Sequence, residues 1–463
     1  MSWYRTGTVT VTNGSTTVTG SGTAWVANSR VGDAFVGPDG LTYEITNIAS
    51  DSAISIYPSY KSNSQSGQGY SIIPVQGYTK KLADQASDLI NDYDEALNTL
   101  ETDYQQNVSN LTIIATDGYR KSIEQNSGGR NTVVYDAQGN PNIMCVIPRF
   151  NVEDLGLPAL NLGTGTHPAF ITNGVPRGEI LIGKYLASSA PGGTAVIGGV
   201  QPRVSVDYDA AKLLCTQKGS NWHLMSIHEW AAIALWSLAN GTVPRGNTNY
   251  GRSHEAKWET ARRSDNGIPG DSSGNGTTDT GKGPATWNHD HTEFGICDMV
   301  GNVLEWIDQF KLVDGQIVVN HDNDPSSAEG EWSYINAFFD SPSSSQSGTG
   351  NVGSPILSNT IINRNGPIGD DTNNYPYMKD SHFANISKSS GYTTNELLRR
   401  LLVESDTTNT VLGAIWCRNY GSRLPLRGGY FGFGADAGAG SIFLGYARSL
   451  SDSSFGFRPA FFS

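Results

Sequence analysis

The spacing of the apolar residues changes twice along this chain, and that change constrains the fold more than any other feature. Apolar side chains alternate over residues 1–75, recur every three or four positions over 79–125, and lose any fixed period beyond 160, where tryptophan becomes frequent. Period two is typical of strands and the longer period of helices. The 463 residues are also too many for one ordinary domain. We therefore expect a multidomain chain with a small β domain over 1–75, an α-helical coiled coil over 76–125, a β-rich linker over 126–160 and a C-terminal domain over 161–463.

The first region is predicted to begin with a β-hairpin. Residues 8–12 alternate threonine and valine, and Asn13-Gly14 is a strong signal for a two-residue hairpin turn. The stretch GTVTVTNGSTTVTGSGTAW at residues 7–25 resembles the small N-terminal β domain of many phage tail-fibre and tail-tip proteins. The resemblance implies that residues 1–75 attach the chain to other phage tail proteins. The alternative is a generic small β domain.

The second region carries an apolar stripe at alternating spacings of four and three, which is the seam of a coiled coil. Beyond Leu100 the spacing becomes four and four, and such a stutter locally unwinds a supercoil. We expect a parallel homotrimer, because fibre proteins commonly form one. A single helix packed on its own chain is the alternative. The residues of the stripe are Leu82, Ala86, Leu89, Tyr93, Ala96, Leu100, Tyr104, Val108 and Leu111.

Charge and composition exclude several partners. The net charge is −13 and no cluster of lysine or arginine stands out, so neither nucleic acid nor an anionic membrane surface is an expected partner. The chain has no run of about 18 apolar residues and its N-terminus has no apolar signal segment, so we expect no membrane insertion and synthesis in a host cytoplasm. The four cysteines form no CxxC pair, which excludes a zinc ribbon; free buried thiols are favoured over two disulfides.

Three segments of the C-terminal region carry a family resemblance. They are WHLMSIHEW at 222–230, GICDMVGNVLEW at 295–306, and RLPLRGG at 423–429 with FGFRPA at 455–460. In this order they resemble the formylglycine-generating-enzyme-like branch of the C-type lectin fold, which implies an α+β domain. Within the first segment, Ser226 followed by Glu229 predicts the capped start of a helix over about 227–238.

A narrower resemblance covers residues 427–461, which look like the variable region of proteins diversified by retroelements. The family pattern implies a fixed scaffold, in which Arg427, Arg448 and Arg458 should be buried or hydrogen-bonded. It also implies a displayed set that contacts the ligand. Tyrosine and phenylalanine provide rigid contact area while serine and glycine adapt, as in antibody paratopes. The displayed positions are Tyr430, Gly432, Phe433, Asp436, Phe443, Gly445, Tyr446, Leu450, Asp452, Ser453 and Ser454.

A metal site is implied by the enzyme branch, in which the loop matching residues 298–305 binds calcium. Carried over, the ligands are the side chains of Asp298 and Glu305 and the carbonyls of Gly301 and Val303. Oxygen ligands on an irregular loop suit Ca²⁺. A purely structural loop is the alternative.

Catalysis is not expected. The enzyme branch binds copper through cysteines near the C-terminus, and the corresponding residues 445–450 read GYARSL. His289 and His291 have no third metal ligand in the sequence around them. We therefore expect a bacteriophage tail-fibre or tail-tip protein that adsorbs to a host cell-surface receptor, protein or glycan, as part of the virion. The alternative is a structural tail or collar protein that only decorates the virion.

Overall fold

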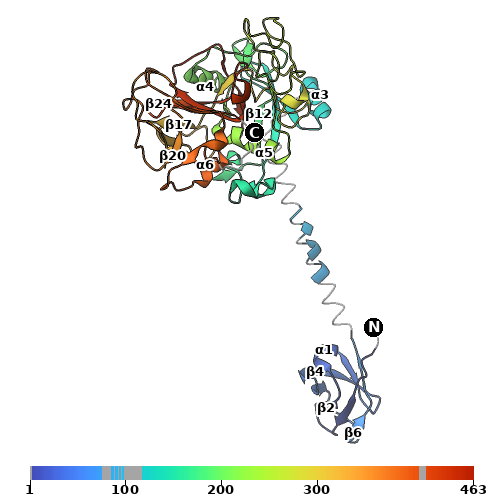
Figure 1. The fold of residues 1–463 in the computed structure, drawn as a ribbon. Coiled ribbons are helices and arrows are strands. Elements are labelled where there is room, and N and C mark those ends of the chain that lie inside the picture. The colour runs from blue at the N-terminus through green and yellow to red at the C-terminus, as the bar shows by residue number, and fades with distance from the viewer. Residues whose placement is uncertain are drawn as a thin grey trace. The chain divides into compact units, whose positions relative to one another are not determined.

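The computed structural model describes residues 3–75, 117–405 and 413–463 and, between these ranges, residues 85–87, 89–91, 93–94 and 96–97. The chain divides into two compact units, Met1–Val108 and Ser109–Ser463 (Figure 1). No helix among the described residues is long and apolar enough to cross a membrane.

The N-terminal unit is one seven-stranded antiparallel sheet with the order β6-β1-β2-β5-β4-β3-β7. The predicted hairpin is present, because Val11 pairs with Val18 across the Asn13-Gly14 turn. Its core gathers inward residues of every strand except β6 around Trp25, whose indole N–H donates to the Tyr70 hydroxyl at 2.9 Å. The elements are β1 (Thr8–Val11), β2 (Thr17–Ser21), α1 (Trp25–Asn28), β3 (Ala34–Val36), β4 (Thr42–Ser50), β5 (Ala53–Tyr57), β6 (Gln65–Gln68) and β7 (Ser71–Ile73).

The trimeric coiled coil predicted over 76–125 is not evident, and that part of the fold prediction is wrong. Leu82, Leu100, Tyr104, Val108 and Leu111 lie outside the described residues. The described helical positions of the stripe are exposed, Leu89 by 69% and Tyr93 by 67%. The physical reason is that the stripe alternates alanine and tyrosine with leucine, whereas a stable seam needs large aliphatic residues at most positions.

The last part of the predicted coil is instead a separate short helix, α3 (Gly118–Ser127). Asp117 accepts hydrogen bonds from the backbone N–H groups of Tyr119 and Arg120, which caps its first turn. Gly128 ends the helix in the left-handed conformation that glycine adopts without strain. The helix packs on strand β8 of the C-terminal unit.

The C-terminal unit contains a five-stranded sheet with the order β15-β27-β12-β9-β8. The strands predicted in the linker are therefore part of this unit, so the boundary expected at residue 160 divides one sheet. Strand β9 belongs to this unit because it is buried within it. Four consecutive residues of its eight are buried, namely Asn142, Ile143, Met144 and Cys145. The strands are β8 (Asn131–Tyr135), β9 (Pro141–Pro148), β12 (Glu179–Gly183), β15 (Trp222–Leu224) and β27 (Pro459–Phe461).

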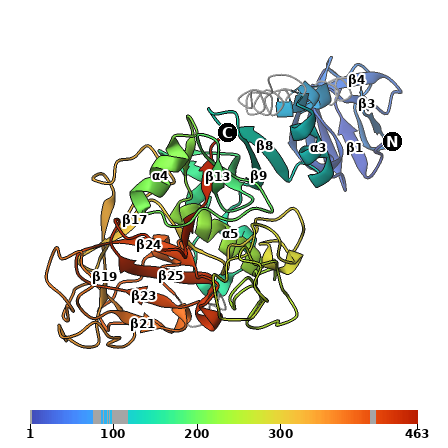
Figure 2. The same cartoon turned by 90° about the horizontal axis from the view of Figure 1, so that it is seen from above.

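The second sheet of this unit has eleven strands, and its main path runs β21-β23-β25-β24-β17-β18-β19-β20-β22 (Figure 2). Strand β16 pairs with both β24 and β26 beside that path. The strands are β16 (Leu304–Trp306), β17 (Phe310–Val313), β18 (Gln316–Val319), β19 (Ser333–Asp340), β20 (Ile356–Ser358), β21 (Met378–Asp380), β22 (Ser387–Lys388), β23 (Ile415–Cys417), β24 (Ser422–Gly428), β25 (Gly438–Tyr446) and β26 (Phe455–Phe457).

Small hairpins and short helices complete the unit. The hairpins are β10 (Ile171–Thr172) with β11 (Val175–Pro176), and β13 (Ser188–Ala190) with β14 (Gly193–Ala195). The helices are α4 (Tyr208–Thr216), α5 (Ile227–Ala239) and α6 (Glu396–Arg400), with 3₁₀ turns at η1 (Val152–Leu155), η2 (Pro158–Leu160), η3 (Pro168–Phe170), η4 (Ala285–Trp287), η5 (Phe383–Asn385) and η6 (Gly434–Asp436).

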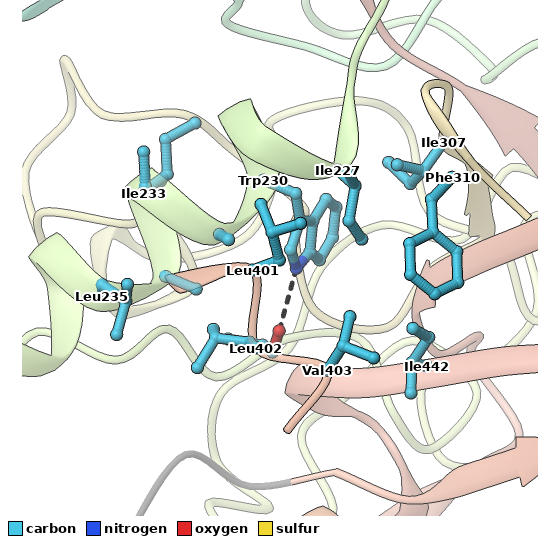
Figure 3. Packing of buried hydrophobic residues seen from close by; sticks show 14 of the residues in the cluster. Ile227, Trp230, Ile233, Leu235, Ile307, Phe310, Leu401, Leu402, Val403 and Ile442 are labelled. Atoms are coloured by element: carbon cyan, nitrogen blue, oxygen red, sulfur yellow. Dashed lines mark hydrogen bonds between the residues drawn. The ribbon is translucent and has the colours of Figure 1, made fainter. Parts of the chain in front are cut away.

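The main core surrounds α5. The predicted capping box is present: the Ser226 hydroxyl accepts from the Glu229 backbone N–H, and the Glu229 carboxylate accepts from the Ser226 backbone N–H. Trp230 is fully buried and its indole N–H donates to the Ala439 carbonyl at 2.9 Å, which ties the helix to strand β25 (Figure 3). Ile227 and Ile233 of the same helix belong to this cluster.

The expected α+β C-type lectin domain needs correction, because strand accounts for 31% of the structure and helix for 17%. The longest helix among the described residues, α5, has 13 residues. The reason lies in the composition: 54 glycines and many serines, threonines and asparagines leave few apolar stretches long enough for a helix and favour short strands with ordered loops.

A truncation series should locate the boundary of the C-terminal unit. A fragment of residues 117–463 should be soluble and melt cooperatively, because it keeps all five strands of the smaller sheet. A fragment of 161–463 lacks β8 and β9, exposes the edge of β12, and should aggregate or melt at a lower temperature. Gel filtration and thermal melting by circular dichroism measure both; equal melting temperatures would contradict the sheet assignment.

Two buried histidines should make the protein sensitive to mild acid. Burial lowers the pKa of His167 and of His228 to about 3. Both stay neutral when folded but gain a proton near pH 6.5 when unfolded, so their stabilising effect is complete above pH 6.5 and is lost as the pH falls towards 3. Each should contribute a slope of up to about 1.4 kcal/mol per pH unit to the free energy of unfolding.

The variant His228→Gln separates this effect from other titrations. Its amide nitrogen can replace the ring nitrogen that lies 3.1 Å from the Asn320 carbonyl, without a proton to gain. Urea unfolding at several pH values should show a shallower acid slope for this variant. The exposed His321→Gln is the control and should keep the slope of the natural protein.

Candidate functional site

The candidate site is built on the hairpin of β24 and β25 and on the loop that joins them, residues 429–437, which we call the display loop. Gly428 and Gly429 both have φ near +85° and start the turn. A Cβ on Gly428 would lie 2.4 Å from the Met299 carbonyl, and one on Gly429 would lie 2.6 Å from the Ala437 Cβ. Only glycine fits at either position, which makes this turn a fixed part of the site.

Backbone hydrogen bonds from outside hold the display loop in place. The Phe431 N–H donates to the Asn302 carbonyl at 3.1 Å, the Tyr250 N–H donates to the Phe431 carbonyl at 2.8 Å, and the Gly434 N–H donates to the Thr248 carbonyl at 2.9 Å. None of these three bonds uses a side chain. These bonds hold the backbone of the loop in place independently of which side chains it carries.

A row of stacked aromatic rings crosses the sheet beside the display loop. Tyr377 stacks on Trp416 with centroids 5.0 Å apart, Trp416 on Phe443 at 4.5 Å, and Phe443 on Tyr446 at 5.5 Å. Strand pairing creates the row, since β23 and β25 are parallel and place Trp416 opposite Phe443. We call these four residues the aromatic row. Its rings cover one another's faces, and Tyr377, Trp416 and Tyr446 remain partly exposed.

The display loop adds further rings to this row. Phe433 stacks on Phe443 at 5.5 Å, and Tyr430 meets Phe433 edge to face at 4.4 Å. Phe431 in turn meets Tyr250 at 5.2 Å, so the loop around residue 250 forms a side wall of the site. Burial raises the pKa of Tyr430 and of Tyr446, and both phenols stay protonated at neutral pH.

Charged groups border the aromatic row. The Lys379 ammonium lies 2.5 Å from the Asp436 carboxylate and 4.8 Å from the centroid of Trp416, where the ring attracts a cation. Arg418 donates to the Gly445 carbonyl at 2.7 Å and lies over Tyr377 and Tyr446. The Trp416 indole N–H has no partner among the described residues. The Arg418 Nε–H likewise has none, and both of these donors are buried. The site thus offers an apolar strip with a polar border.

The structure divides the displayed positions expected from sequence into three groups. Gly432, Asp452 and Ser453 are exposed, and Tyr430, Phe433, Asp436, Tyr446 and Leu450 are half-buried, whereas Phe443, Gly445 and Ser454 are buried. The expected display of the Phe443 side chain is thus wrong, because this ring is only 3% exposed. The reason is that Phe443 lies on β25, a central strand between β23 and β24 whose pairing encloses it.

The scaffold arginines are buried or hydrogen-bonded, as predicted. Arg427 is fully buried and donates to the carbonyls of Leu401, Leu402 and Gly440. Burial without a carboxylate partner lowers its pKa to about 9. Arg448 is half-buried and pairs with the carboxylates of Asp209 and Glu329.

The loop expected to bind calcium has a different arrangement of charges. Glu305 is fully buried, and both of its oxygens accept hydrogen bonds from the Arg458 guanidinium, at 3.0 and 2.9 Å. Asp298 accepts from the Gly281 N–H at 2.7 Å, and burial raises its pKa to about 6. Because a guanidinium occupies the chelating side of Glu305, the residues around Asp298, Gly301, Val303 and Glu305 do not fit Ca²⁺ in this arrangement.

The histidines considered as metal ligands or catalytic groups make structural contacts instead. His223 lies 2.8 Å from Glu229 in the core, and the His289 ring accepts from the Ile296 N–H. Among the described residues no three histidine, cysteine, aspartate or glutamate side chains converge as metal ligands do. The four cysteines are free and buried, as the sequence favoured.

Several residues of the site could not be found from the sequence. Tyr377, Trp416, Lys379 and Tyr250 lie outside the region 427–461 and join the site through the pairing of β21, β23 and β25 or through the loop around residue 250. No local motif marks them, because the contacts bridge more than 25 residues of sequence in each case.

Comparison with known proteins gives a limited likeness. No protein-family model and no curated protein matches the sequence. Among solved structures, "Treponema denticola variable protein 1" aligns over 72% of this chain and 98% of its own length at 11% identity, with a TM-score of 0.26. "Major Tropism Determinant U1 Variant" aligns over 69% of this chain and 63% of its own length at 12% identity, with the same TM-score. These structural neighbours are a variable protein and a tropism determinant, and at this TM-score nothing about the site follows from them.

Substitutions should separate the supporting from the presenting positions of the site. Phe443→Ala removes a buried ring from the aromatic row and should lower the free energy of unfolding by about 3–5 kcal/mol. Ser453→Ala changes an exposed residue and should stay within about 0.5 kcal/mol of the natural protein. Chemical denaturation measures both, and a small effect for Phe443→Ala would mean that this ring is displayed after all.

Proposed function

We propose that this protein is a bacteriophage tail protein whose C-terminal unit binds a receptor on the surface of a host cell. The observation that carries the proposal is that two features meet at one place: a display loop whose backbone is hydrogen-bonded to Thr248, Tyr250 and Asn302, and an aromatic strip with a polar border beside it. Rigid aromatic side chains at the centre of an interface typically supply most of its binding energy.

The aromatic row and display loop have the composition of a binding surface. Tyr430, Phe433 and Tyr446 are half-buried, so they are fixed by their neighbours yet still present ring edges to a partner. Lys379 and Asp436 neutralise each other at the border, and the remaining cation there, Arg418, is already buried and bonded to the Gly445 carbonyl. Such fixed rings lose little conformational entropy on binding.

The backbone anchoring of the display loop also supports variation of its side chains between copies of the gene. Asp452 and Ser453 are exposed, so their replacement leaves the core untouched, whereas a Cβ on exposed Gly432 would lie 2.9 Å from the Tyr430 ring and would move it. Replacement of buried Phe443, Gly445 or Ser454 would disturb the sheet. We propose that diversification, where it occurs, is tolerated mainly at the exposed and half-buried positions.

The remaining parts of the proposal concern the virion. The N-terminal unit, residues 3–75 of which form a closed core of their own, attaches the chain to another tail protein. The protein acts in the assembled tail and performs no catalysis. Electron microscopy of tails labelled with an antibody against the N-terminal unit tests the attachment.

Binding to whole bacteria tests the receptor assignment. Fluorescently labelled protein is applied to a panel of bacterial strains and cell-bound label is measured by flow cytometry. On a strain that binds the natural protein, Tyr430→Ala should reduce the apparent affinity about tenfold or more. Tyr119→Ala, which truncates an exposed tyrosine on α3 in the same unit, is the matched control and should bind normally.

Two outcomes would count against the assignment. Equal loss of binding for both variants would show that the display loop is not the contact surface. Unfolding of Tyr430→Ala, seen as a lost melting transition, would show that this ring serves the core.

A further inference from the structure

The positive charge at the centre of the 298–305 loop is the guanidinium of Arg458, a side chain of the protein itself. Arg458 lies between β26 and β27, and Glu305 lies on β16; both side chains are completely buried. Their contact is bidentate, Nε to Oε2 at 3.0 Å and Nη2 to Oε1 at 2.9 Å. Two parallel charge-assisted hydrogen bonds are the strongest arrangement open to this pair.

The rest of the guanidinium is bonded to main-chain oxygens. Nη1 donates to the Gly183 carbonyl at 2.9 Å and Nη2 donates to the Cys297 carbonyl at 2.8 Å. One cation therefore gathers a carboxylate and two carbonyls, from β12, from the start of the loop and from β16. A calcium ion in an irregular loop gathers the same kinds of oxygen.

A calcium ion and this guanidinium compete for the same carboxylate. A carboxylate that chelates calcium holds the ion on the side where its two oxygens converge, which here faces the guanidinium. Two cations side by side in a buried site repel strongly, because the interior screens charge poorly. The negative Asp298 beside the pair adds further attraction for the arginine.

Buried arginine side chains also bond to main-chain carbonyls at other loops of this unit. Arg263 is 1% exposed and donates to the carbonyls of Ile268, Asp271 and Ser273 while it pairs with Asp265. Arg423 is fully buried and donates to the carbonyls of Asp370, Asp371 and Thr372. Buried guanidinium groups thus organise loops throughout the unit.

We propose that Arg458 is the built-in cation of the 298–305 loop, so that the protein folds without calcium, and that removal of the guanidinium opens a site for a divalent cation between Glu305 and Asp298.

Thermal melting of the full chain in millimolar CaCl₂ or in EDTA tests the first part. The natural protein should melt at the same temperature in both, because a ligand raises the melting temperature only if it binds the folded state. Isothermal titration of CaCl₂ into the protein should show no binding. A lower melting temperature in EDTA, or measurable calcium binding that Glu305→Gln abolishes, would overturn the proposal.

The variant Arg458→Ala tests the second part. It should be less stable than the natural protein in EDTA, since Glu305 and Asp298 are left as buried unpaired carboxylates, and calcium should raise its melting temperature by several degrees. Arg427→Ala is the matched control, because it also removes a buried guanidinium but one bonded only to carbonyls. Its melting temperature should not respond to calcium.

A failure of Arg458→Ala to fold in EDTA is also informative. The variant is then refolded from urea with and without CaCl₂, and recovery of soluble protein only with calcium supports the proposal. Equal recovery under both conditions, or an equal response of Arg427→Ala, would overturn the proposed latent cation site.

Discussion

The C-terminal unit depends on arginine side chains buried among main-chain oxygens. Arg263, Arg423, Arg427 and Arg458 are among its largest fully buried side chains. Each bonds to carbonyl groups of irregular segments that no strand or helix would satisfy, and an unsatisfied buried carbonyl is costly. A chain with only 37% hydrophobic residues could not order such long loops by apolar packing alone. The guanidinium, with five donors in a rigid plane, connects several loops at once.

The buried arginines help to explain how the binding surface can keep a fixed backbone while its side chains vary. The display loop begins at two glycines that fit no other residue and is then held by backbone bonds from Thr248, Tyr250 and Asn302. Arg427, directly before those glycines, fixes the end of β24. Every fixed element lies in the backbone or below the sheet, while the side chains at the tip have few structural duties.

The sequence predicted the local features well and the distant contacts poorly. The Asn13-Gly14 hairpin and the Ser226–Glu229 capping box are set by neighbouring residues, and both are present. The burial of Arg427 and Arg458 agrees with the fixed scaffold that the resemblance implied, and their hydrogen bonds with the cost of an unpaired buried charge. The contact between Glu305 and Arg458 was missed, because the two residues are 153 positions apart and nothing local indicates that they meet. The aromatic row was missed for the same reason, since Trp416 and Tyr377 join it only through strand pairing.

The position of β27 has a consequence for the order of events during synthesis. This strand is made late in the sequence, at Pro459–Phe461, yet it lies between β15 and β12 in the interior of the five-stranded sheet. Arg458, next to it, provides the cation for a loop made more than 150 residues earlier. Neither the five-stranded sheet nor the loop can therefore close before residues 455–461 have been synthesised. In the N-terminal unit the sheet also joins distant strands, β1 with β6 and β3 with β7, but all of its strands lie within residues 8–73. During synthesis the N-terminal sheet can therefore be complete well before the smaller sheet of the C-terminal unit.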